Sequence, residues 1–241
     1  MCPKPQSKLP LSVIIITHRQ DQRFYQAQKS AQFAQEVLIV KPTQPISDFA
    51  QVRNQALKQA QHNWVLFLDS DEIIDAQSIA QLKTLLTNPD VQAYTLKRTD
   101  VFLNQALTAG EAYQQHLIRL MKKQAAHFQY QVHEQAVVKG LVQTSNLQLW
   151  HYAHQSLADF WQKITYYAKL KAQELTKENF SKSKLIWQLL TYPPAKFINN
   201  FFIKQGFRDR WRGLVYATMM SLHSLMVRIY LYELKKSPSA T

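Results

Sequence analysis

An acidic turn that directly follows an apolar run is the feature that most constrains this chain. Residues 64–68 (Trp-Val-Leu-Phe-Leu) have the length of a strand, and Asp69, Asp71 and Glu72 follow within four residues. Side chains alternate along a strand, so Asp69 and Asp71 point to the same side. Two hard oxygen ligands at such a position suit Mg²⁺ or Mn²⁺ already bound to a diphosphate. The alternative is a solvated acidic turn without a ligand.

Two further strands are predicted upstream of this turn. Residues 11–17 and 36–40 are short apolar runs without alternation, which is typical of strands covered on both faces. The apolar spacing predicts a helix over residues 24–35, and strand, helix and strand together form a βαβ unit. Ligands of open α/β sheets bind beyond the carboxyl ends of strands. We therefore expect residues 17–19, Lys41 and the acidic turn to converge on one crevice.

More helices are predicted between and after these strands. Ser47 or Asp48 can cap a helix that begins at Phe49 and runs to about residue 60. A second helix is predicted over residues 75–87. Another amphipathic helix begins at Leu157. Further on, Tyr192-Pro-Pro194 is expected to break any continuous helix.

Several classes of protein lose their usual sequence support. Only four glycines occur, at positions 110, 140, 206 and 213, so neither GxGxxG nor GxxxxGK[ST] can be written. The single cysteine, Cys2, excludes an internal disulfide framework and a Cys-rich zinc site. No signal peptide is recognisable at the start, and we expect the protein to begin in the cytoplasm.

The positive charge is concentrated in the last third of the chain. The net charge is +13; Lys and Arg outnumber Asp and Glu by 15 to 11 up to Gln155, and by 14 to 5 from Ser156 onward. Such a basic, aromatic-rich segment serves either nucleic acid or an anionic membrane surface. Residues 211–232 are mostly apolar, but Arg212, His223 and Arg228 interrupt them, so we expect an in-plane helix rather than a spanning one. The alternative is a helix pair packed on the protein itself or on a second subunit.

An ordered series of short motifs resembles family 2 glycosyltransferases of the GT-A fold, in particular lipopolysaccharide core glucosyltransferase-like enzymes. The matching pieces occur in the order of that family and cover most of residues 11–232. They are Ser12-Val-Ile-Ile-Ile-Thr17, Phe49-Ala-Gln-Val-Arg53-Asn54-Gln-Ala56-Leu57, Trp64-Val-Leu-Phe-Leu-Asp69-Ser-Asp71-Glu72, Leu117-Ile-Arg119-Leu120, Val132-His133-Glu134 and Leu149-Trp-His151-Tyr152, leading into Tyr166-Tyr167-Ala168.

The resemblance implies an α/β, Rossmann-like GT-A domain whose mostly parallel central sheet is flanked by helices. We expect this domain to span residues 1–155, with a nucleotide-sugar half over about 10–100 and an acceptor half over about 100–155. A basic, amphipathic helical and membrane-associating region is expected over residues 156–241.

The resemblance also implies a reaction: metal-dependent, inverting transfer of a sugar, a hexosyl group, from a nucleotide diphosphate sugar to an acceptor hydroxyl. Asp71, assisted by Asp69 or Glu72, would hold Mg²⁺ or Mn²⁺ on the diphosphate, and His151 is a further candidate ligand. Arg53 could contact a phosphate, since guanidinium matches phosphate geometry. Thr17 and Arg19 would lie beside the nucleotide, and Asp69 is also assigned to donor binding.

Inversion requires a general base, and Glu134 is the first candidate because it lies in the family-like Val-His-Glu motif, while Asp100 and Glu111 remain possible. His133 and Arg119 are assigned to the acceptor side. The expected acceptor is a lipid-linked or lipopolysaccharide-like glycan of the cell envelope. The expected location is the inner face of the cell membrane, with the protein bound peripherally, and nucleic acid is the less favoured partner.

One departure from the family pattern keeps other functions open. The family has an acidic turn with a base-contacting Asp after its second strand, whereas here Lys41-Pro-Thr-Gln-Pro45 follows Val40 and the Arg-Asn pair arrives thirteen residues after Val40. The alternatives are a degenerate GT-A fold that binds a glycan or scaffolds a complex, and a basic nucleic-acid-binding protein.

Overall fold

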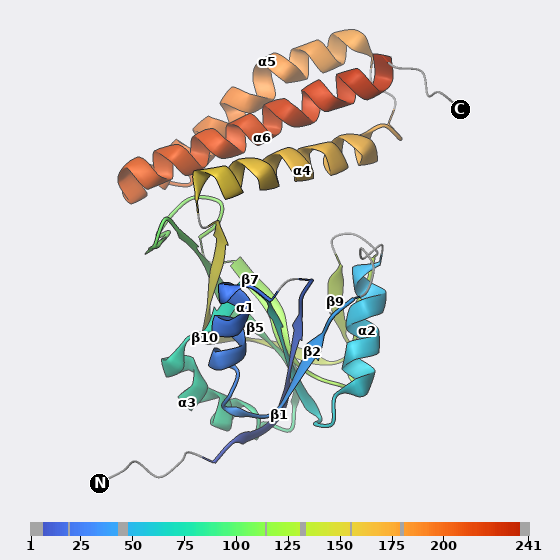
Figure 1. The fold of residues 1–241 in the computed structure, drawn as a ribbon, viewed down its shortest axis with the longest axis vertical. Helices are drawn as coiled ribbons and strands as arrows, with labels where there is room; N and C mark the ends of the chain where they lie inside the picture. Colours follow the sequence, from blue (N-terminus) through green and yellow to red (C-terminus); the bar gives the residue numbers. More distant parts are fainter. Residues whose placement is uncertain are drawn as a thin grey trace. The chain divides into compact units, whose positions relative to one another are not determined.

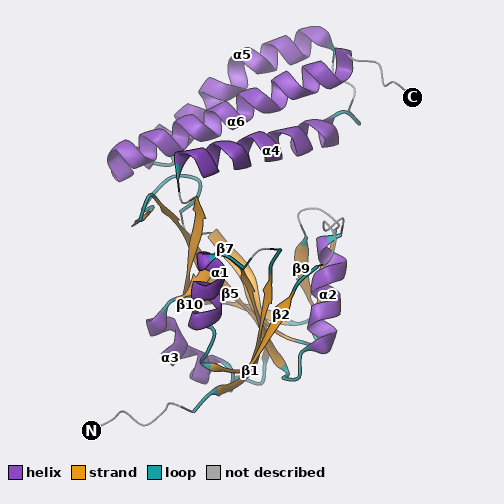
Figure 2. Cartoon of the chain, in the orientation of Figure 1, coloured by secondary structure: helices purple, strands orange, loops and turns teal. Residues whose placement is uncertain are grey.

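The chain folds into two units. The second unit includes a segment, residues 100–113, that lies in the sequence between the two parts of the first. The computed structural model describes residues 7–18, 20–42, 48–113, 115–130, 134–154, 156–178 and 181–236. Unit 1 comprises Met1–Thr99 and Gln114–Tyr152, and unit 2 comprises Asp100–Tyr113 and Ala153–Thr241. Figures 1 and 2 show that unit 1 is built on a sheet and that the larger part of unit 2 is helical.

A mixed sheet of eight strands runs through the chain in the order β2-β1-β3-β7-β5-β10-β4, with β6 paired to β5. β1 pairs in parallel with β2 and with β3, whereas β3 with β7, β7 with β5, and β4 with β10 pair antiparallel. A separate hairpin consists of β8 and β9. The strands are β1 (Leu9–Ile16), β2 (Ala34–Val40), β3 (Trp64–Asp69), β4 (Glu72–Ile74), β5 (Val91–Phe102), β6 (Gln105–Ala106), β7 (Gln115–Lys122), β8 (Ala126–Gln129), β9 (Gln135–Val138) and β10 (Leu141–His154).

Each helix of unit 1 begins at an aspartate cap. The helices are α1 (Gln22–Ser30), α2 (Phe49–Gln59) and α3 (Ala76–Leu85). Asp21, Asp48 and Asp75 accept hydrogen bonds from backbone N–H groups of the first turn, at 3.1, 2.8 and 2.9 Å. These bonds satisfy donors that have no partner inside the helix. The predicted βαβ unit, the α/β class and the cap at Asp48 are confirmed.

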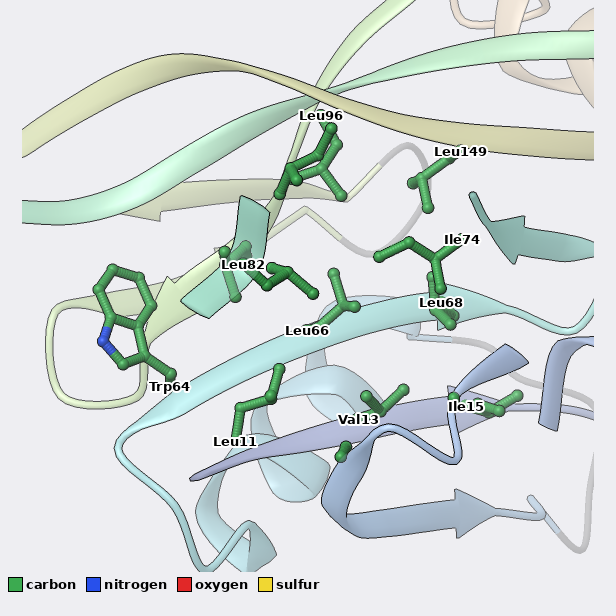
Figure 3. Packing of buried hydrophobic residues seen from close by; sticks show 14 of the residues in the cluster. Leu11, Val13, Ile15, Trp64, Leu66, Leu68, Ile74, Leu82, Leu96 and Leu149 are labelled. Atoms are coloured by element: carbon green, nitrogen blue, oxygen red, sulfur yellow. The ribbon is translucent and has the colours of Figure 1, made fainter. Parts of the chain in front are cut away.

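The core of unit 1 lies on both faces of the parallel strands. Along β1, Val13 and Ile15 belong to one buried cluster and Ile14 to the other, as the alternation of a strand requires. α1 and α3 pack on the first face, and α2 with the β8–β9 hairpin packs on the second. Figure 3 shows the first cluster, in which leucines from β1, β3, α3 and β10 meet. Covering on both faces explains why these strands lack polar alternation.

Unit 2 is a layer of helices in which α6 packs against both α4 and α5. Its own buried cluster joins Phe102 at the end of β5, Phe160 of α4 and Met219 of α6. The elements are α4 (Leu157–Leu175), α5 (Lys182–Ile198), a π-helix η1 (Asn199–Ile203), a short 3-10 helix η2 (Gly206–Asp209) and α6 (Arg210–Lys236).

The expected break at Tyr192-Pro-Pro194 is wrong, because α5 continues through Pro193 and Pro194. A proline inside a helix removes one hydrogen bond and its ring crowds the carbonyl four residues earlier, at a cost of about 3 kcal/mol. Here the packing of α5 along α6 holds the helix together. Ser221 of α6 donates a hydrogen bond to the Pro193 carbonyl at 2.7 Å, which ties the two helices at this point.

The segment 100–113 is fastened to the helices of unit 2 by buried polar contacts. The Asp209 carboxylate accepts hydrogen bonds from the backbone N–H groups of Thr108 (2.8 Å) and Ala109 (3.1 Å). Glu111 pairs with Lys196 at 2.7 Å and accepts a hydrogen bond from the Asn200 side chain at 3.0 Å. Burial would raise the pKa of Glu111, but these partners hold that pKa below its usual value, so Glu111 remains ionised.

Gly213 is required by a close approach between α6 and η2. A Cβ atom at this position would lie 1.8 Å from the carbonyl oxygen of Gly206, which is far inside van der Waals contact. Because the obstacle is backbone, no side-chain rotation can relieve the overlap.

We therefore expect Gly213→Ala to destabilise the protein by about 1–3 kcal/mol, as overpacking does. In an ordinary helix the same change stabilises by about 1 kcal/mol, so the sign of the effect is diagnostic. Urea unfolding followed by circular dichroism measures it. Leu214→Ala, at the exposed neighbouring position, is the control and should change stability little. A Gly213→Ala protein as stable as the wild type would contradict the packing described here.

Candidate functional site

The carboxyl ends of the three parallel strands lie side by side, as predicted. β1 and β3 pair with Ile16 opposite Asp69, so Thr17 comes directly after the residue that faces the acidic turn. Thr17 is buried, and its N–H group donates to the Val40 carbonyl of β2 at 3.0 Å. Arg19, which was predicted to join them, lies outside the described residues.

Asp69 is held between two arginines that come from different elements. Arg53 of α2 donates from Nη2 to one oxygen of Asp69 at 2.8 Å, and Arg119 of β7 donates from Nη2 to the other oxygen. Both guanidiniums are largely buried. Arg53 and Arg119 were assigned to the donor and to the acceptor side; those roles stay predictions, and both side chains are engaged with Asp69.

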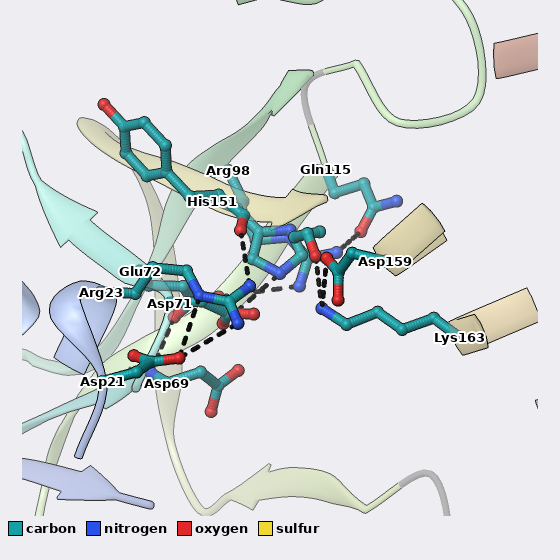
Figure 4. A network of polar contacts seen from close by, with 12 residues as sticks. Asp21, Arg23, Asp69, Asp71, Glu72, Arg98, Gln115, His151, Asp159 and Lys163 are labelled. Atoms are coloured by element: carbon teal, nitrogen blue, oxygen red, sulfur yellow. Dashed lines mark hydrogen bonds and ion pairs between the residues drawn. The ribbon is translucent and has the colours of Figure 1, made fainter. Parts of the chain in front are cut away.

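The ion pairs continue beyond Asp69 in both directions, with alternating charge. On one side, Arg53 Nε donates to Glu134 at 2.9 Å. On the other side, Arg119 donates to the fully buried Glu72 at 2.7 Å, and Arg98 of β5 lies 3.6 Å from the same carboxylate. Figure 4 shows Glu72 and Arg98 in this polar region. We call the set Glu134, Arg53, Asp69, Arg119, Glu72 and Arg98 the ion-pair chain.

The ion-pair chain fixes the protonation state of Asp69. Burial would raise the pKa of Asp69, but the charges of Arg119 and Arg53 outweigh burial and hold the pKa well below its usual range. Burial likewise lowers the pKa of Arg119, while the carboxylates of Asp69 and Glu72 raise it above the ordinary arginine value. Asp69 therefore stays an anion at neutral pH and is a weak base.

Arg53 is positioned by aromatic rings as well as by carboxylates. Its guanidinium carbon lies 5.4 Å from the centre of the Phe67 ring and 5.5 Å from that of Phe128, distances typical of cation–π contacts. The neighbouring Asn54 bonds both the N–H group and the carbonyl of Phe128, at 2.8 and 2.9 Å. This explains the Arg-Asn pair: Asn54 ties α2 to β8, and Arg53 enters the site.

Asp71 points toward a different partner from Asp69. Asp71 Oδ1 lies 3.6 Å from Nε2 of His151. In the backbone register of the antiparallel strands β4 and β10, His151 lies opposite Glu72. The carbonyl of Asp71 accepts a hydrogen bond from the Tyr152 N–H group at 2.8 Å. Arg23 of α1 donates to the Tyr152 carbonyl at 3.4 Å and to Asp21 at 3.1 Å. Figure 4 shows Asp71 and His151 on neighbouring segments of this network.

The donor chemistry of Asp71 and His151 fits a divalent cation that takes most of its ligands from elsewhere. A carboxylate oxygen and an imidazole nitrogen 3.6 Å apart are close enough to share one ion. Within the described part of the chain, no group of three or more His, Cys, Asp and Glu side chains is arranged to hold a metal by itself. The residues present therefore suit an ion whose other ligands are phosphate and water oxygens.

The structure brings together most of the predicted residues and adds two that sequence reasoning missed. Glu134, Arg53, Asp69 and Arg119 share the ion-pair chain, while Asp71 and His151 form a separate pair. His133, like Arg19, lies outside the described residues. Arg98 was missed. It lies two residues after the buried Leu96, so both side chains lie on the same side of β5. A charged residue on a core-facing side indicates a buried partner. Arg23 carried no such signal.

Removing Arg119 should be costly, because the fully buried Glu72 would lose its ion pair at 2.7 Å and Asp69 would lose one of its two arginines. We expect Arg119→Met to lower the free energy of unfolding by about 3–5 kcal/mol, the usual cost of removing one partner from buried ion pairs. Urea unfolding provides the measurement. The control is Lys171→Met, which removes an exposed ion pair with Glu174 and should cost at most about 1 kcal/mol. Equal effects of the two substitutions would mean that the ion-pair chain is not a structural element.

Comparison with known proteins gives one match to a family model. Residues 26–133 match the model described as "Glycosyl transferase family 2". A TPR repeat-containing protein of Synechococcus elongatus is 32% identical over 88 residues, which are 36% of this chain and 20% of that protein. The chain thus spans one fifth of the length of this curated relative.

Two solved structures show more remote similarity. The crystal structure of S. aureus TarS is 13% identical, with a TM-score of 0.42, over 84% of this chain and 46% of that one. The mannosyltransferase PcManGT of Pyrobaculum calidifontis, solved with GDP-Man and Mn²⁺, is 11% identical with a TM-score of 0.42, over 99% of this chain and 78% of that one. Likenesses of this size carry no conclusion about substrate. The match of residues 26–133 to this family model agrees with the predicted family, and the predicted α/β class is borne out by the strands and helices of unit 1.

Proposed function

We propose that this chain is an inverting glycosyltransferase that moves a hexosyl group from a nucleotide diphosphate sugar to a hydroxyl group of a lipid-linked or cell-envelope glycan. The observation that carries the proposal is the pairing of Asp71 with His151 beside the ion-pair chain, in a domain of family 2. In the reaction the acceptor oxygen forms a bond to the anomeric carbon, the bond to the diphosphate breaks, and the nucleoside diphosphate leaves with the electron pair.

Asp71 and His151 are the residues that would hold Mg²⁺ or Mn²⁺. When bound, such an ion neutralises negative charge on the leaving diphosphate. Asp69 was assigned as a further metal and donor ligand. Its two oxygens already accept hydrogen bonds from Arg53 and Arg119, so we propose a supporting role in which Asp69 orients both guanidiniums.

Arg53 and Thr17 are proposed to contact the donor. Arg53 keeps one buried nitrogen, Nη1, without a hydrogen-bond partner among the described residues, and a buried unpaired N–H group is costly. A phosphate oxygen is a suitable acceptor for it. Thr17 is proposed for the nucleotide side because it stands at the end of β1, next to the acidic turn. Arg19 is proposed for the same side from its place in the sequence.

Glu134 is the proposed general base, which takes the proton from the acceptor hydroxyl. Asp69 is unsuited to this role because its depressed pKa makes it a very weak base. Glu111 is occupied by Lys196 and Asn200. Glu134 accepts one hydrogen bond from Arg53, which orients its carboxylate. His133 and Arg119 remain the proposed acceptor-side residues.

The acceptor and the location are proposed together. The basic excess of residues 156–241 would attract an anionic membrane surface, where a lipid-linked or lipopolysaccharide-like acceptor resides. We therefore place the protein peripherally on the inner face of the cell membrane.

One observation favours a second candidate, a GT-A fold that binds a glycan without transferring sugar. Both oxygens of Asp69 already contact arginines, so a metal would have to rely on Asp71 and His151. The turn between β2 and α2, where the family has its base-contacting Asp, is also short here. The two candidates differ in whether the protein binds a nucleotide in a metal-dependent way.

Metal-dependent nucleotide binding should depend on Asp71. We expect one of UDP, GDP, ADP, CMP and dTDP to raise the melting temperature of the wild-type protein in the presence of Mn²⁺, because a ligand that binds only the folded state stabilises it. Asp71→Ala should abolish the shift and His151→Gln should reduce it. Asp90→Ala, which removes a carboxylate at an exposed position, is the matched control. A wild-type protein that responds to none of the five nucleotides would favour the glycan-binding candidate.

Replacing Glu134 should affect the rate of sugar transfer more than the affinity for the donor. Glu134→Gln retains an oxygen that can accept the hydrogen bond from Arg53 Nε, so the fold and the donor affinity should persist. We expect the rate of sugar transfer to fall by about 10²–10⁴-fold, the usual contribution of a general base. Steady-state kinetics with sugar donors that carry the nucleotide identified by the melting experiment provides the test, and Glu174→Gln on α4 is the control. Unchanged turnover would assign the base elsewhere.

A further inference from the structure

The helix α5 turns its apolar side outward. Ile186, Leu190, Pro194, Ile198 and Phe202 recur at every fourth residue along α5 and η1, and all are exposed. With Trp187 and Ile203 they form a continuous surface without a charge, which we call the α5 stripe. The exposed fractions reach 60% for Trp187, 67% for Leu190 and 71% for Ile203.

The buried side of the same segment contains Leu185, which is 3% exposed, together with polar groups. Gln188 of α5 is 6% exposed and Asn200 of η1 is 1% exposed. In a helix that packs only on its own protein, the apolar stripe faces the core and polar residues face water. The packing within unit 2 therefore leaves the α5 stripe uncovered, although stripe and buried side belong to the same helix. A contiguous exposed apolar surface of this kind marks a site of interaction.

Charge beside the α5 stripe distinguishes a bilayer from a protein partner. Lys184 and Lys204 lie near the two ends of the stripe, and Arg208 follows in η2. The cores of protein–protein interfaces are depleted in lysine. Helices that lie in a membrane surface, by contrast, combine lysine and arginine with exposed Trp, Phe and Leu. Trp187 and Trp211, both exposed, are the residue type enriched at the boundary of the hydrocarbon region.

The neighbouring α6 is consistent with the same partner. Together with η2 it spans Gly206–Lys236, 31 residues with a mean hydropathy of 1.3 in its most apolar window, which by length and composition is enough to cross a membrane. Core helices of soluble proteins reach the same values. Arg228 of α6 stacks over the Tyr192 ring of α5 at 4.4 Å, so its charge is accommodated within unit 2.

We infer that the α5 stripe is the surface on which the protein lies in an anionic bilayer. α5 and η1 are parallel to the membrane plane, the apolar side chains enter the hydrocarbon, and the adjacent lysines contact headgroup phosphates. Residues 186–203 give a contact roughly 25 Å long at 1.5 Å per residue. The inference deepens the proposed membrane location by naming the face that binds; it does not depend on the transfer chemistry.

The test is sedimentation of the full chain with vesicles of phosphatidylglycerol and phosphatidylethanolamine, compared with vesicles of phosphatidylcholine alone. The wild type should bind the anionic vesicles more tightly, and Leu190→Asp with Phe202→Asp should weaken that binding by at least about tenfold, since affinity follows buried apolar area. Leu141→Asp is the matched control, because Leu141 is a comparably exposed leucine (54%) at the start of β10. Circular dichroism verifies that each variant is folded.

A second variant protects the test against misfolding of the first. Ile203→Asp changes one highly exposed side chain and should weaken vesicle binding in the same direction. Asp71→Ala should leave vesicle binding unchanged, so loss of transferase activity and loss of membrane binding are distinguishable. The inference is overturned if the wild type binds neither vesicle, or if the aspartate variants bind as the wild type does. It is also overturned if the wild type is a dimer that the aspartate variants convert to a monomer without effect on vesicles, because the stripe would then bind a second copy.

Discussion

The placement of Asp69 between Arg53 and Arg119 is the interaction on which the candidate site depends. The two arginines come from α2 and β7, so one carboxylate connects a helix on one face of the sheet with a strand at its centre. Glu134 and Glu72 extend the contact at either end, and opposite charges alternate throughout. Charges buried in this way require good geometry, because losing one partner leaves another charge unpaired in a medium of low dielectric constant. The fold and the site are therefore held by the same groups.

Sequence patterns predicted the framework of unit 1 because local rules govern it. The runs around Ile14 and Leu66 are apolar without alternation since both faces are covered, and Asp48 caps a helix whose first turn it can reach. The pairing of Asp69 with Arg119 lies beyond such rules: the two residues are 50 positions apart, and motif position assigned each to a ligand instead. The sequence also did not predict that Asp69 and Asp71 contact different residues. The alternation of a strand predicts that two side chains share a side, but not which residues they contact.

In unit 2 the sequence predicted helices correctly and their orientation poorly. Leu157 begins a long helix, as its spacing indicates. Pro193 and Pro194 are strong local signals for a break, yet packing against α6 overrides them. The periodicity of α5 reveals an apolar side but not whether that side faces inward, since a hydrophobic pattern is the same for a core and for an external apolar phase. The exposure of Leu190 and Phe202, beside the buried Gln188 and Asn200, shows that this apolar side faces outward.

The acidic turn is rigid before any ligand arrives. The Glu72 carboxylate accepts a hydrogen bond from the Asp69 N–H group at 3.1 Å, and Tyr152 binds the Asp71 carbonyl, so the backbone on either side of Ser70 is fixed by the fold. Ordering a flexible backbone costs about 1–2 kcal/mol per residue. Because the backbone of this turn is already ordered in the folded protein, a ligand that binds Asp71 does not have to order it. Less of the favourable binding free energy is then offset by lost conformational entropy. Ligand binding at this turn should consequently change the turn's backbone conformation little.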